Sequence, residues 1–505
     1  MVISDPINLL KDIQRTAEIV HGNIYLVGGC LRDFLLDRPV NDIDLAISGD
    51  AELLSQKLAS QTQGQAFPLD AYRGIYRVLA HQTDNNTSQI DITTFESNIE
   101  ADLSYRDLTI DSLAIPLNEI NHAKHPSEWS IIDPFNGKND LLNKIIRAIK
   151  PEIYSDDPVR LLRTIRIASE LNFSIEPDTI KFMEWHYNKI QNSPGERIRD
   201  EFLKILSGNF LEESIYRLSD IGILGIIFPE LQEGRDVVQP KEHYWNVYDH
   251  NLQCAFKVDL LLDDSRNIDI NKHPELKYVP SNDITKKYFQ SECSDSHTRT
   301  TILKLAALLH DVGKPKTKQI DSNGKMRFLG HSEIGMELAR NALERLRISN
   351  RGIETVCTMI KEHLRPSQIA PTGEMPSKRA LYRYFRDLED VAIDTLFLNL
   401  ADYLAARGPL IDIYDWSVHC DRIRYILEEG SETNNTITNS NLISGHDLIN
   451  TLGLKPGPYF KIILENISEA QAEGFVKTKE DALSLAKKKY IEYSSVGDTD
   501  AETKS

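Results

Sequence analysis

One short segment, Tyr25 to Ser48, constrains the fold of this chain more than any other. Its sequence, YLVGGCLRDFLLDRPVNDIDLAIS, predicts an apolar strand that stops at a pair of glycines, then a helix, then a second strand. Asp42 and Asp44 are two residues apart on that second strand, so their side chains project from the same face. Two carboxylates on one rigid face can share hard cations such as Mg²⁺. The segment therefore predicts a mixed α/β structure with a Mg²⁺ site at Asp42 and Asp44.

The two glycines between the strands predict a place where phosphates can approach the backbone. Gly28 and Gly29 lack a Cβ atom, and Arg32 and Asp33 open the helix that follows them. A Gly-Gly pair alone, or an Asp-x-Asp pair alone, is equally compatible with a strand turn or a solvated acidic edge. Their order in one segment favours a site that binds a metal and a triphosphate together.

This ordered combination resembles the signature of the class II tRNA nucleotidyltransferase and poly(A) polymerase family, Gly-Gly-x-x-Arg-Asp followed by Asp-x-Asp. A second segment, SYRDLTIDSLAI from Ser104 to Ile115, resembles the family's Arg-Arg-Asp-Phe-Thr-Ile-Asn-Ala. The resemblance implies that Asp42 and Asp44 are catalytic, and that Arg106 binds the nucleotide phosphates together with the Gly-Gly segment and its arginine. Tyr105 stands where the family has its first arginine, and Asp111 stands where it has asparagine.

A third segment, SDDPVRLLRTIRIAS, carries polar residues at a spacing of three. Asp157, Arg160, Arg163 and Arg166 would form one continuous polar face on a helix. In the family this helix selects the incoming base without a nucleic-acid template. The resemblance implies that Asp157 and Arg160 read the base, while Arg163 and Arg166 support the pocket and the phosphates. An ordinary amphipathic helix start explains the same spacing, and both interpretations are compatible. The segment Pro194 to Leu206 resembles the family's neck helix, which holds helices together.

The second half of the chain carries a different constellation. The segment LAALLHDVGKPKT places a histidine and an aspartate side by side at the end of an apolar helix, which resembles HD-domain metal phosphohydrolases. One His-Asp pair is weak evidence for a metal site, but further histidines and an aspartate occur in the expected order. The candidate ligands are His250, His310, Asp311 and Asp402, with His331 and His363 where members with a second metal have ligands. The metal implied is Mn, Ni, Co or Mg.

The composition shifts predict an α+β chain of several modules, since 505 residues exceed a single core. Short β-rich runs alternate with helical ones in the first part, as in a polymerase beta-like head, and helical periodicity dominates afterwards. The polar stretch from Leu262 to His297 predicts an irregular insertion, and Glu429 to Asn439 a linker. We expect a nucleotidyltransferase head (1–150), a helical nucleotide-selecting neck and RNA-binding region (151–235), an HD domain (236–430), a C-terminal helical module (441–490) and a disordered tail (491–505).

Global properties restrict location and partners. No apolar run approaches the ~20 residues of a membrane span. The start, MVISDPINLLKDIQ, lacks a signal-peptide pattern, and the five cysteines form no Cys-x-x-Cys pair. We therefore expect a cytoplasmic protein that does not bind membranes. The net charge of −18 opposes RNA binding by the whole surface, so RNA contacts need a local basic face. The sequence leaves the oligomeric state open.

The resemblance implies a template-independent enzyme that adds CCA, or part of it, to tRNA 3′ ends from CTP and ATP. The RNA 3′-hydroxyl would attack the α-phosphate with Mg²⁺ bound, and pyrophosphate would leave. Only FESNIEADLSY separates the strand IDITT from Arg106, so CC-only or A-only addition stays open, as does poly(A) addition. Two other classes remain as alternatives: an HD-type phosphohydrolase that acts on nucleotides or RNA ends, and a noncatalytic RNA-binding protein.

Overall fold

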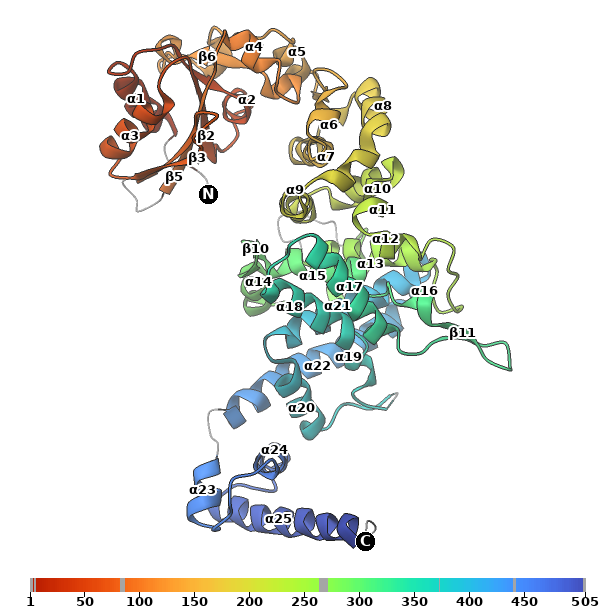
Figure 1. Cartoon of the computed structure of the whole chain (residues 1–505). Coiled ribbons are helices and arrows are strands. Elements are labelled where there is room, and N and C mark those ends of the chain that lie inside the picture. Colours follow the sequence, from red (N-terminus) through yellow and green to blue (C-terminus); the bar gives the residue numbers. More distant parts are fainter. Residues whose placement is uncertain are drawn as a thin grey trace. The chain divides into compact units, whose positions relative to one another are not determined.

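The computed structural model describes residues 3, 6–81, 87–262, 271–371, 373–438 and 442–502, without the side chains of 431–438 and 494–502. The chain forms two compact units, Met1–Ile227 and Phe228–Ser505 (Figure 1). Within the described residues, none of the helices combines the length and apolarity needed to cross a membrane.

The first unit begins with a six-stranded mixed sheet in the order β3-β4-β5-β2-β1-β6. Only β2 and β5 pair in parallel, and the other neighbours are antiparallel. The strands are β1 (Ile24–Val27), β2 (Asp42–Ile47), β3 (Gln65–Asp70), β4 (Ile75–His81), β5 (Thr87–Thr94) and β6 (Ala114–Pro116). The short helices α2 (Gly29–Leu35), α4 (Ile99–Leu103) and α5 (Gly137–Leu142) connect or flank them.

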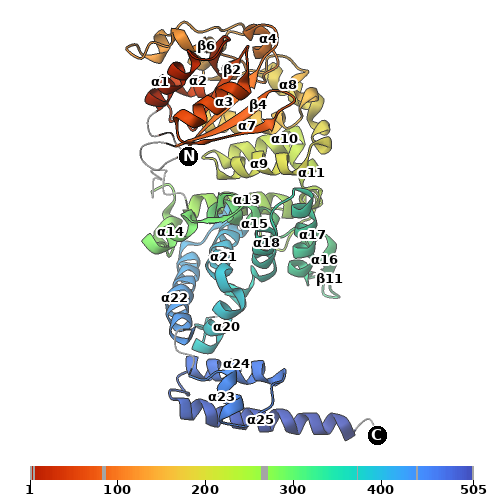
Figure 2. The same cartoon turned by 60° about the vertical axis from the view of Figure 1, so that its left-hand side comes forward.

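One face of this sheet is apolar because every second residue of its central strands is an apolar residue. Helices α1 (Pro6–Ala17) and α3 (Ala51–Gln61) lie side by side against the sheet (Figure 2). Their leucines and isoleucines share one core with Ile43 and Leu45 of β2. The strand's period of two then turns the intervening residues, Asp42 and Asp44, to the opposite face.

The rest of the first unit is helical apart from the two-residue strands β7 (Ile145–Ile146) and β8 (Ser174–Ile175). Its helices are α6 (Ile153–Asp156), α7 (Arg160–Leu171), α8 (Pro177–His186), α9 (Gly195–Ser207), α10 (Leu211–Ile221) and α11 (Ile223–Ile227). The prediction of one helix through Asp157 and Arg166 is wrong at its start, because α7 begins at Arg160. Asp157 has extended backbone, φ −144° and ψ 95°, as expected for a residue that precedes a proline.

The second unit is a set of helices with two small hairpins. Helices α13, α15 and α21 pack on one another, and α18 packs on α15 and α21. The helices are α12 (Pro229–Gln232), α13 (Val247–Leu262), α14 (Asp283–Gln290), α15 (Arg299–Leu309), α16 (Lys314–Thr317), α17 (His331–Arg345), α18 (Asn350–Glu362), α19 (Arg365–Gln368), α20 (Lys378–Leu388), α21 (Ala392–Arg407), α22 (Ile413–Thr438), α23 (Gly445–Asn450), α24 (Tyr459–Ala472) and α25 (Lys479–Glu502). The hairpin strands are β9 (Glu292–Ser294) with β10 (His297–Thr298), and β11 (Lys318–Ile320) with β12 (Met326–Phe328).

A mixed-sheet head followed by a mainly helical body confirms the predicted α+β class. The predicted irregular insertion is wrong in part: residues 263–270 lie outside the described residues, but α14 is a regular helix. Asn282 caps it, accepting hydrogen bonds from the backbone N–H groups of Ile284 and Thr285.

Two further stretches are more helical than we expected. The predicted linker 429–439 belongs to α22 as far as Thr438. Helix α25, anchored by buried Ala482 and Ala486, runs to Glu502 through most of the expected tail 491–505. Propagation of an anchored helix costs little per residue, which explains both extensions.

Candidate active site and metal centre

The face of the sheet opposite α1 and α3 carries the two predicted metal ligands. Asp42 is exposed and Asp44 is half-buried on neighbouring positions of that face. Burial, and then the negative charge of Asp42, raises the pKa of Asp44 to about 7. A bound cation stabilises the charged form of a carboxylate whose pKa is raised, so Asp44 with its neighbour Asp42 fits a divalent metal.

A third carboxylate, which we did not predict, lies on the adjacent strand. In the parallel pairing of β2 and β5, Asp91 is the register partner of Asp44. Arg77 of β4 donates two hydrogen bonds to Asp91, at 2.7 and 2.8 Å. The sequence pattern that could have revealed Asp91 is its position between two buried isoleucines, Ile90 and Ile92, which turns its side chain to the opposite face. Asp91 therefore adds negative charge to the edge of the same site.

The turn between β1 and α2 brings the glycine segment to the carboxylates. Gly28 has a φ of +78°, and a Cβ there would lie 2.7 Å from Nη1 of Arg106 and 3.1 Å from Oδ2 of Asp44. Arg106 pairs weakly with Asp102 at 3.5 Å, and its buried Nε has no hydrogen-bond partner among the residues that the structure describes. Glycine is thus required where the backbone, the Arg106 guanidinium and the Asp44 carboxylate meet. Gly29, the next residue, is the first of α2.

Arg32, predicted to bind phosphates, is held among carboxylates instead of facing open solvent. It is 7% exposed, donates to Oδ1 of Asp111 at 2.7 Å and to Oδ1 of Asp33 at 2.9 Å. Asp111 is itself 2% exposed. Arg32 therefore holds the carboxylates of Asp111 and Asp33 in place.

Arg163 and Arg166 on α7 are also held by acidic side chains. Arg163 donates to Oδ2 of Asp107 at 2.7 Å and lies 3.5 Å from Oδ2 of Asp111. Arg166 donates to Glu201 at 2.6 Å and to Glu170 at 2.7 Å. Arg163 thus ties α7 to the head segment, whereas the structure does not bring Arg166 to the phosphate site.

The two predicted base-reading residues lie at the N-terminal end of α7, where Arg160 is the first residue of the helix and Asp157 precedes it. Arg197 of α9 donates two hydrogen bonds to Asp157, at 3.0 and 2.7 Å. Arg160 lies 4.0 Å from Asp157 and donates to the backbone carbonyl of Tyr105 at 2.8 Å. Tyr105 precedes Arg106, so the predicted base-reading pair lies next to the segment that carries the arginine predicted to contact the nucleotide phosphates.

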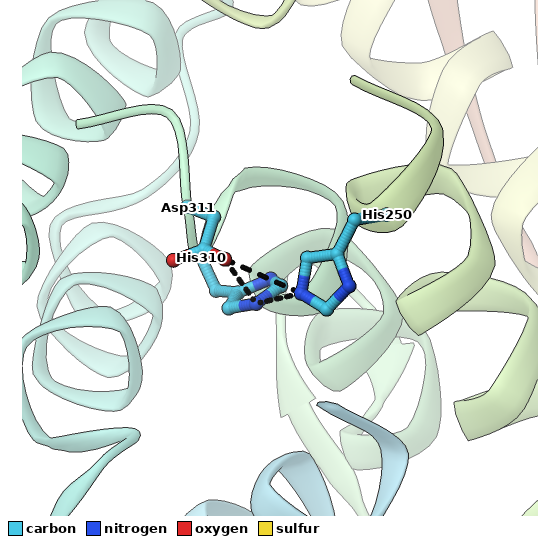
Figure 3. Close-up of side chains that lie close together, drawn as sticks. All are labelled: His250, His310 and Asp311. Carbon is cyan, nitrogen blue, oxygen red and sulfur yellow. Dashed lines mark hydrogen bonds and ion pairs between the residues drawn. The ribbon is translucent and has the colours of Figure 1, made fainter. Parts of the chain in front are cut away.

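The second unit brings all six HD candidates together from five helices or their ends. Figure 3 shows His250 of α13 facing His310 and Asp311, which follow α15. Nε2 of His250 lies 3.2 Å from Nε2 of His310 and 3.3 Å from Oδ2 of Asp311. It also lies 3.0 Å from Oδ1 of Asp402 on α21. The ligand atoms of His250, His310 and Asp311 are close enough to share one ion, as are those of His310, His363 and Asp402.

The other oxygen of Asp311 faces a second pair of histidines. Oδ1 of Asp311 lies 3.4 Å from Nε2 of His331 and 3.8 Å from Nε2 of His363. Both of those atoms, Oδ1 of Asp311 and Nε2 of His331, are buried and have no hydrogen-bond partner within the described structure. Such orphaned polar atoms are costly unless something binds them.

Three of these histidines are oriented for metal binding by their backbones. Nδ1 of His310, His331 and His363 pairs with the carbonyl oxygens of Ala307, Phe328 and Ile360, at 2.6–2.8 Å. Donation from Nδ1 leaves the Nε2 lone pair directed at the cluster. Burial lowers the pKa of His363 to about 4, which keeps its imidazole neutral. The six residues therefore fit a divalent metal.

A cavity of about 380 Å³ opens onto this cluster. Lys314, which we did not predict, projects into it with Nζ 2.5 Å from Oδ2 of Asp311. A cation beside the candidate metal ligands suits an anionic substrate. The sequence feature that could have identified Lys314 is its position three residues after Asp311 in the HDVGK segment.

Three family models match the chain in sequence. They describe a poly(A) polymerase head domain at residues 24–147, a probable RNA and SrmB-binding site of polymerase A at 172–234, and an HD domain at 284–407. Among curated proteins, the chain is 28% identical to an A-adding tRNA nucleotidyltransferase of Deinococcus radiodurans, covering 92% of this chain and 94% of that one. It is 29% identical to a CC-adding tRNA nucleotidyltransferase of Thermus thermophilus, covering 90% and 91%.

Solved structures share the fold. A CCA-adding enzyme with ATP has a TM-score of 0.60 at 19% identity, covering 96% of this chain and 93% of that one. A Thermotoga maritima CCA-adding enzyme in complex with tRNA-CCA has a TM-score of 0.57 at 19% identity, covering 96% and 95%. The matches in sequence span the head, the neck and the HD region in the predicted order. The chain therefore carries a poly(A) polymerase head domain and an HD domain, and over nine-tenths of its length it is similar to tRNA nucleotidyltransferases.

Proposed function

We propose that this chain is a nucleotidyltransferase that adds nucleotides of the CCA sequence to tRNA 3′ ends, using CTP, ATP or both. The observation that carries the proposal is the pair Asp42 and Asp44 on one strand face, beside Gly28 and Arg106. Relatives that match nine-tenths of the chain are named CC-adding or A-adding enzymes. The proposal therefore includes three reactions of the same site: CC addition, A addition and complete CCA addition.

In the proposed mechanism Asp42 and Asp44 hold Mg²⁺. When bound there, Mg²⁺ lowers the pKa of the RNA 3′-hydroxyl and neutralises the departing pyrophosphate. The backbone at Gly28 and Gly29 lies against the triphosphate, and Arg106 balances its charge. The 3′-hydroxyl attacks the α-phosphorus in line, the bond to pyrophosphate breaks, and no protein nucleophile takes part.

The neck supplies base choice in this proposal. Asp157 and Arg160 present hydrogen-bonding edges to the incoming base, and Arg197 orients Asp157 through two hydrogen bonds. Arg32 and Arg163 position Asp107 and Asp111 rather than contact phosphate. We assign nucleotide transfer to a head at about residues 1–150 and base selection to a neck at about residues 151–235.

A second candidate function belongs to the HD cluster. We propose that its residues hold one or two divalent cations, with Asp311 able to serve both, and that the site hydrolyses phosphate esters of nucleotides or RNA. Support comes from the two oxygens of Asp311, which face different histidine groups. A pair of cations bridged in this way is a common arrangement for phosphoester hydrolysis.

Removing one charge at the strand site should abolish transfer. Asp44→Asn keeps the shape of the side chain but weakens cation binding, so we expect a loss of at least about a thousandfold in kcat. The measurement is incorporation of labelled nucleotide into tRNA transcripts that end before CCA. Asp37→Asn, on an exposed turn of the same unit, is the matched control and should stay near wild type. Equal activity of the two variants would remove the metal role.

Truncating the base reader should alter selectivity more than rate. For Asp157→Ala we expect the ratio of kcat/KM for CTP to that for ATP to change at least about tenfold, because a lost hydrogen-bonding edge is base-specific. Asp200→Ala, an exposed carboxylate of α9, serves as control. A fall in kcat/KM by the same factor for both nucleotides would contradict base reading by Asp157.

Metal content tests the HD proposal without reference to a substrate. Purified protein loaded with Mn²⁺ and passed over a desalting column should retain metal in the wild type and lose most of it in His310→Ala, because a ligand is removed. Elemental analysis gives the stoichiometry. His186→Ala, on α8 of the other unit, should retain the wild-type amount. Identical retention in His310→Ala and wild type would rule out the cluster as the binding site.

A further inference from the structure

A basic hairpin leads away from the HD cluster. Residues 314–330, here called the basic arm, connect Asp311 to His331 and contain α16, β11 and β12. In the register of the hairpin, Lys318 is opposite Phe328 and Ile320 is opposite Met326. In Figure 1 the segment labelled β11 extends away from the helices of its unit.

The base of the arm forms part of the HD cavity. Its lining includes the four residues Met326–Leu329 as well as Lys314 and Arg407. Nζ of Lys314 lies 2.5 Å from Asp311 and 5.7 Å from the ring centre of Phe328. A phosphate at the cluster would therefore lie next to the first residues of the arm.

The arm is strongly basic in an acidic chain. Its sequence, KPKTKQIDSNGKMRFLG, has five lysine or arginine residues and one aspartate, whereas the whole chain carries −18. Lys316 lies 3.9 Å from Glu233 and Arg327 pairs with Asp321. Lys318 and Lys325 make no ion pair with any residue in the described parts of the chain, and both are exposed. Two positive charges are thus left for an external anion.

Apolar side chains accompany these free charges. Ile320 and Leu329 are 66% and 64% exposed on the arm. Residues directly opposite in an antiparallel pair share a face, so Lys318, Ile320, Met326 and Phe328 lie on one side of the hairpin. This side of the hairpin carries one lysine and three apolar side chains. Such a combination fits a nucleic-acid strand, because a cation can contact its phosphates and apolar groups can contact its bases.

The length of the arm distinguishes a strand from a mononucleotide. At about 3.3 Å per residue, Lys325 lies roughly 10 Å along the hairpin from Phe328. A single phosphate held at Asp311 and Lys314 cannot reach that far. A ligand that also contacts Lys325 therefore needs a second phosphate farther along the arm.

We propose that the basic arm binds the backbone of an RNA strand and delivers its terminal phosphate monoester to the HD cluster. This inference rests on the proposed phosphohydrolase function of that cluster. Water attacks the terminal phosphorus, the bond from phosphorus to the ribose oxygen breaks, and a proton from water passes to that oxygen. The products are inorganic phosphate and an RNA end with a free hydroxyl group.

Lysine acetylation of the whole protein tests the binding step without requiring hydrolysis. With a saturating octaribonucleotide in metal-free buffer, we expect acetylation of Lys318 and Lys325 to slow at least about threefold, as read by mass spectrometry. Lys286 and Lys287, exposed on α14, are the internal controls and should not slow. Unchanged rates at Lys318 and Lys325 would overturn the proposal. Equal protection by octaglutamate would also overturn it and assign the arm to an acidic protein segment.

Hydrolysis by charge variants tests delivery. For Lys318→Ser/Lys325→Ser, the ratio of kcat/KM for octaribonucleotides with a 3′- or 5′-phosphate to that for p-nitrophenyl phosphate should fall about tenfold, since two phosphate contacts are lost. Lys286→Ser/Lys287→Ser should keep the ratio. A ratio that is unchanged in the arm variant would overturn delivery by the arm. If no ester is hydrolysed by wild type, the phosphohydrolase proposal fails, and the acetylation result alone decides whether the arm binds RNA.

Discussion

The first unit depends on one constraint, the alternation of side chains along β2. Ile43 and Leu45 must enter the core beneath α1 and α3, so Asp42 and Asp44 are forced to the other face. Burial, and then the negative charge of Asp42, raises the pKa of Asp44 to about 7. The hydrophobic core thus sets the geometry of the proposed cation site, and a one-residue slip of the strand would disrupt the core and this site together.

Around that site, arginines serve mainly to hold carboxylates in place. Arg32 and Arg163, from different parts of the first unit, both approach buried Asp111. Breaking such a buried pair is costly, because it leaves a charge without a partner. The head segment and α7 are therefore coupled by charge, which keeps Asp157 and Arg160 beside Tyr105 and Arg106. Arg106, whose buried Nε has no hydrogen-bond partner in the described parts of the chain, is the arginine that we propose contacts a phosphate.

The parts of the two sites that follow from a local sequence pattern were predictable from the sequence. The period of two placed Asp42 and Asp44 together, and resemblance to the HD signature selected six residues that do converge. Asp91 was missed because its place beside Asp44 depends on the long-range pairing of β5 with β2. The pairing of Arg166 with Glu201 was missed because helical spacing alone does not show that Glu201 of α9 lies opposite. Two local effects made other predictions wrong. Pro158 keeps Asp157 in extended backbone, so α7 begins only at Arg160. The polar residue Asn282 caps a regular helix, α14, within the stretch that we expected to be irregular.

In the function proposed here, the strand carboxylates and the neck together extend tRNA 3′ ends. The most direct measurement is to incubate the protein and Mg²⁺ with tRNA transcripts that end before CCA, after C and after CC, supplying CTP and ATP singly and together. The claim predicts addition of C, of A, or of both in order, to at least one of these ends. Absence of incorporation into every transcript, by protein that is folded and metal-loaded, would contradict it.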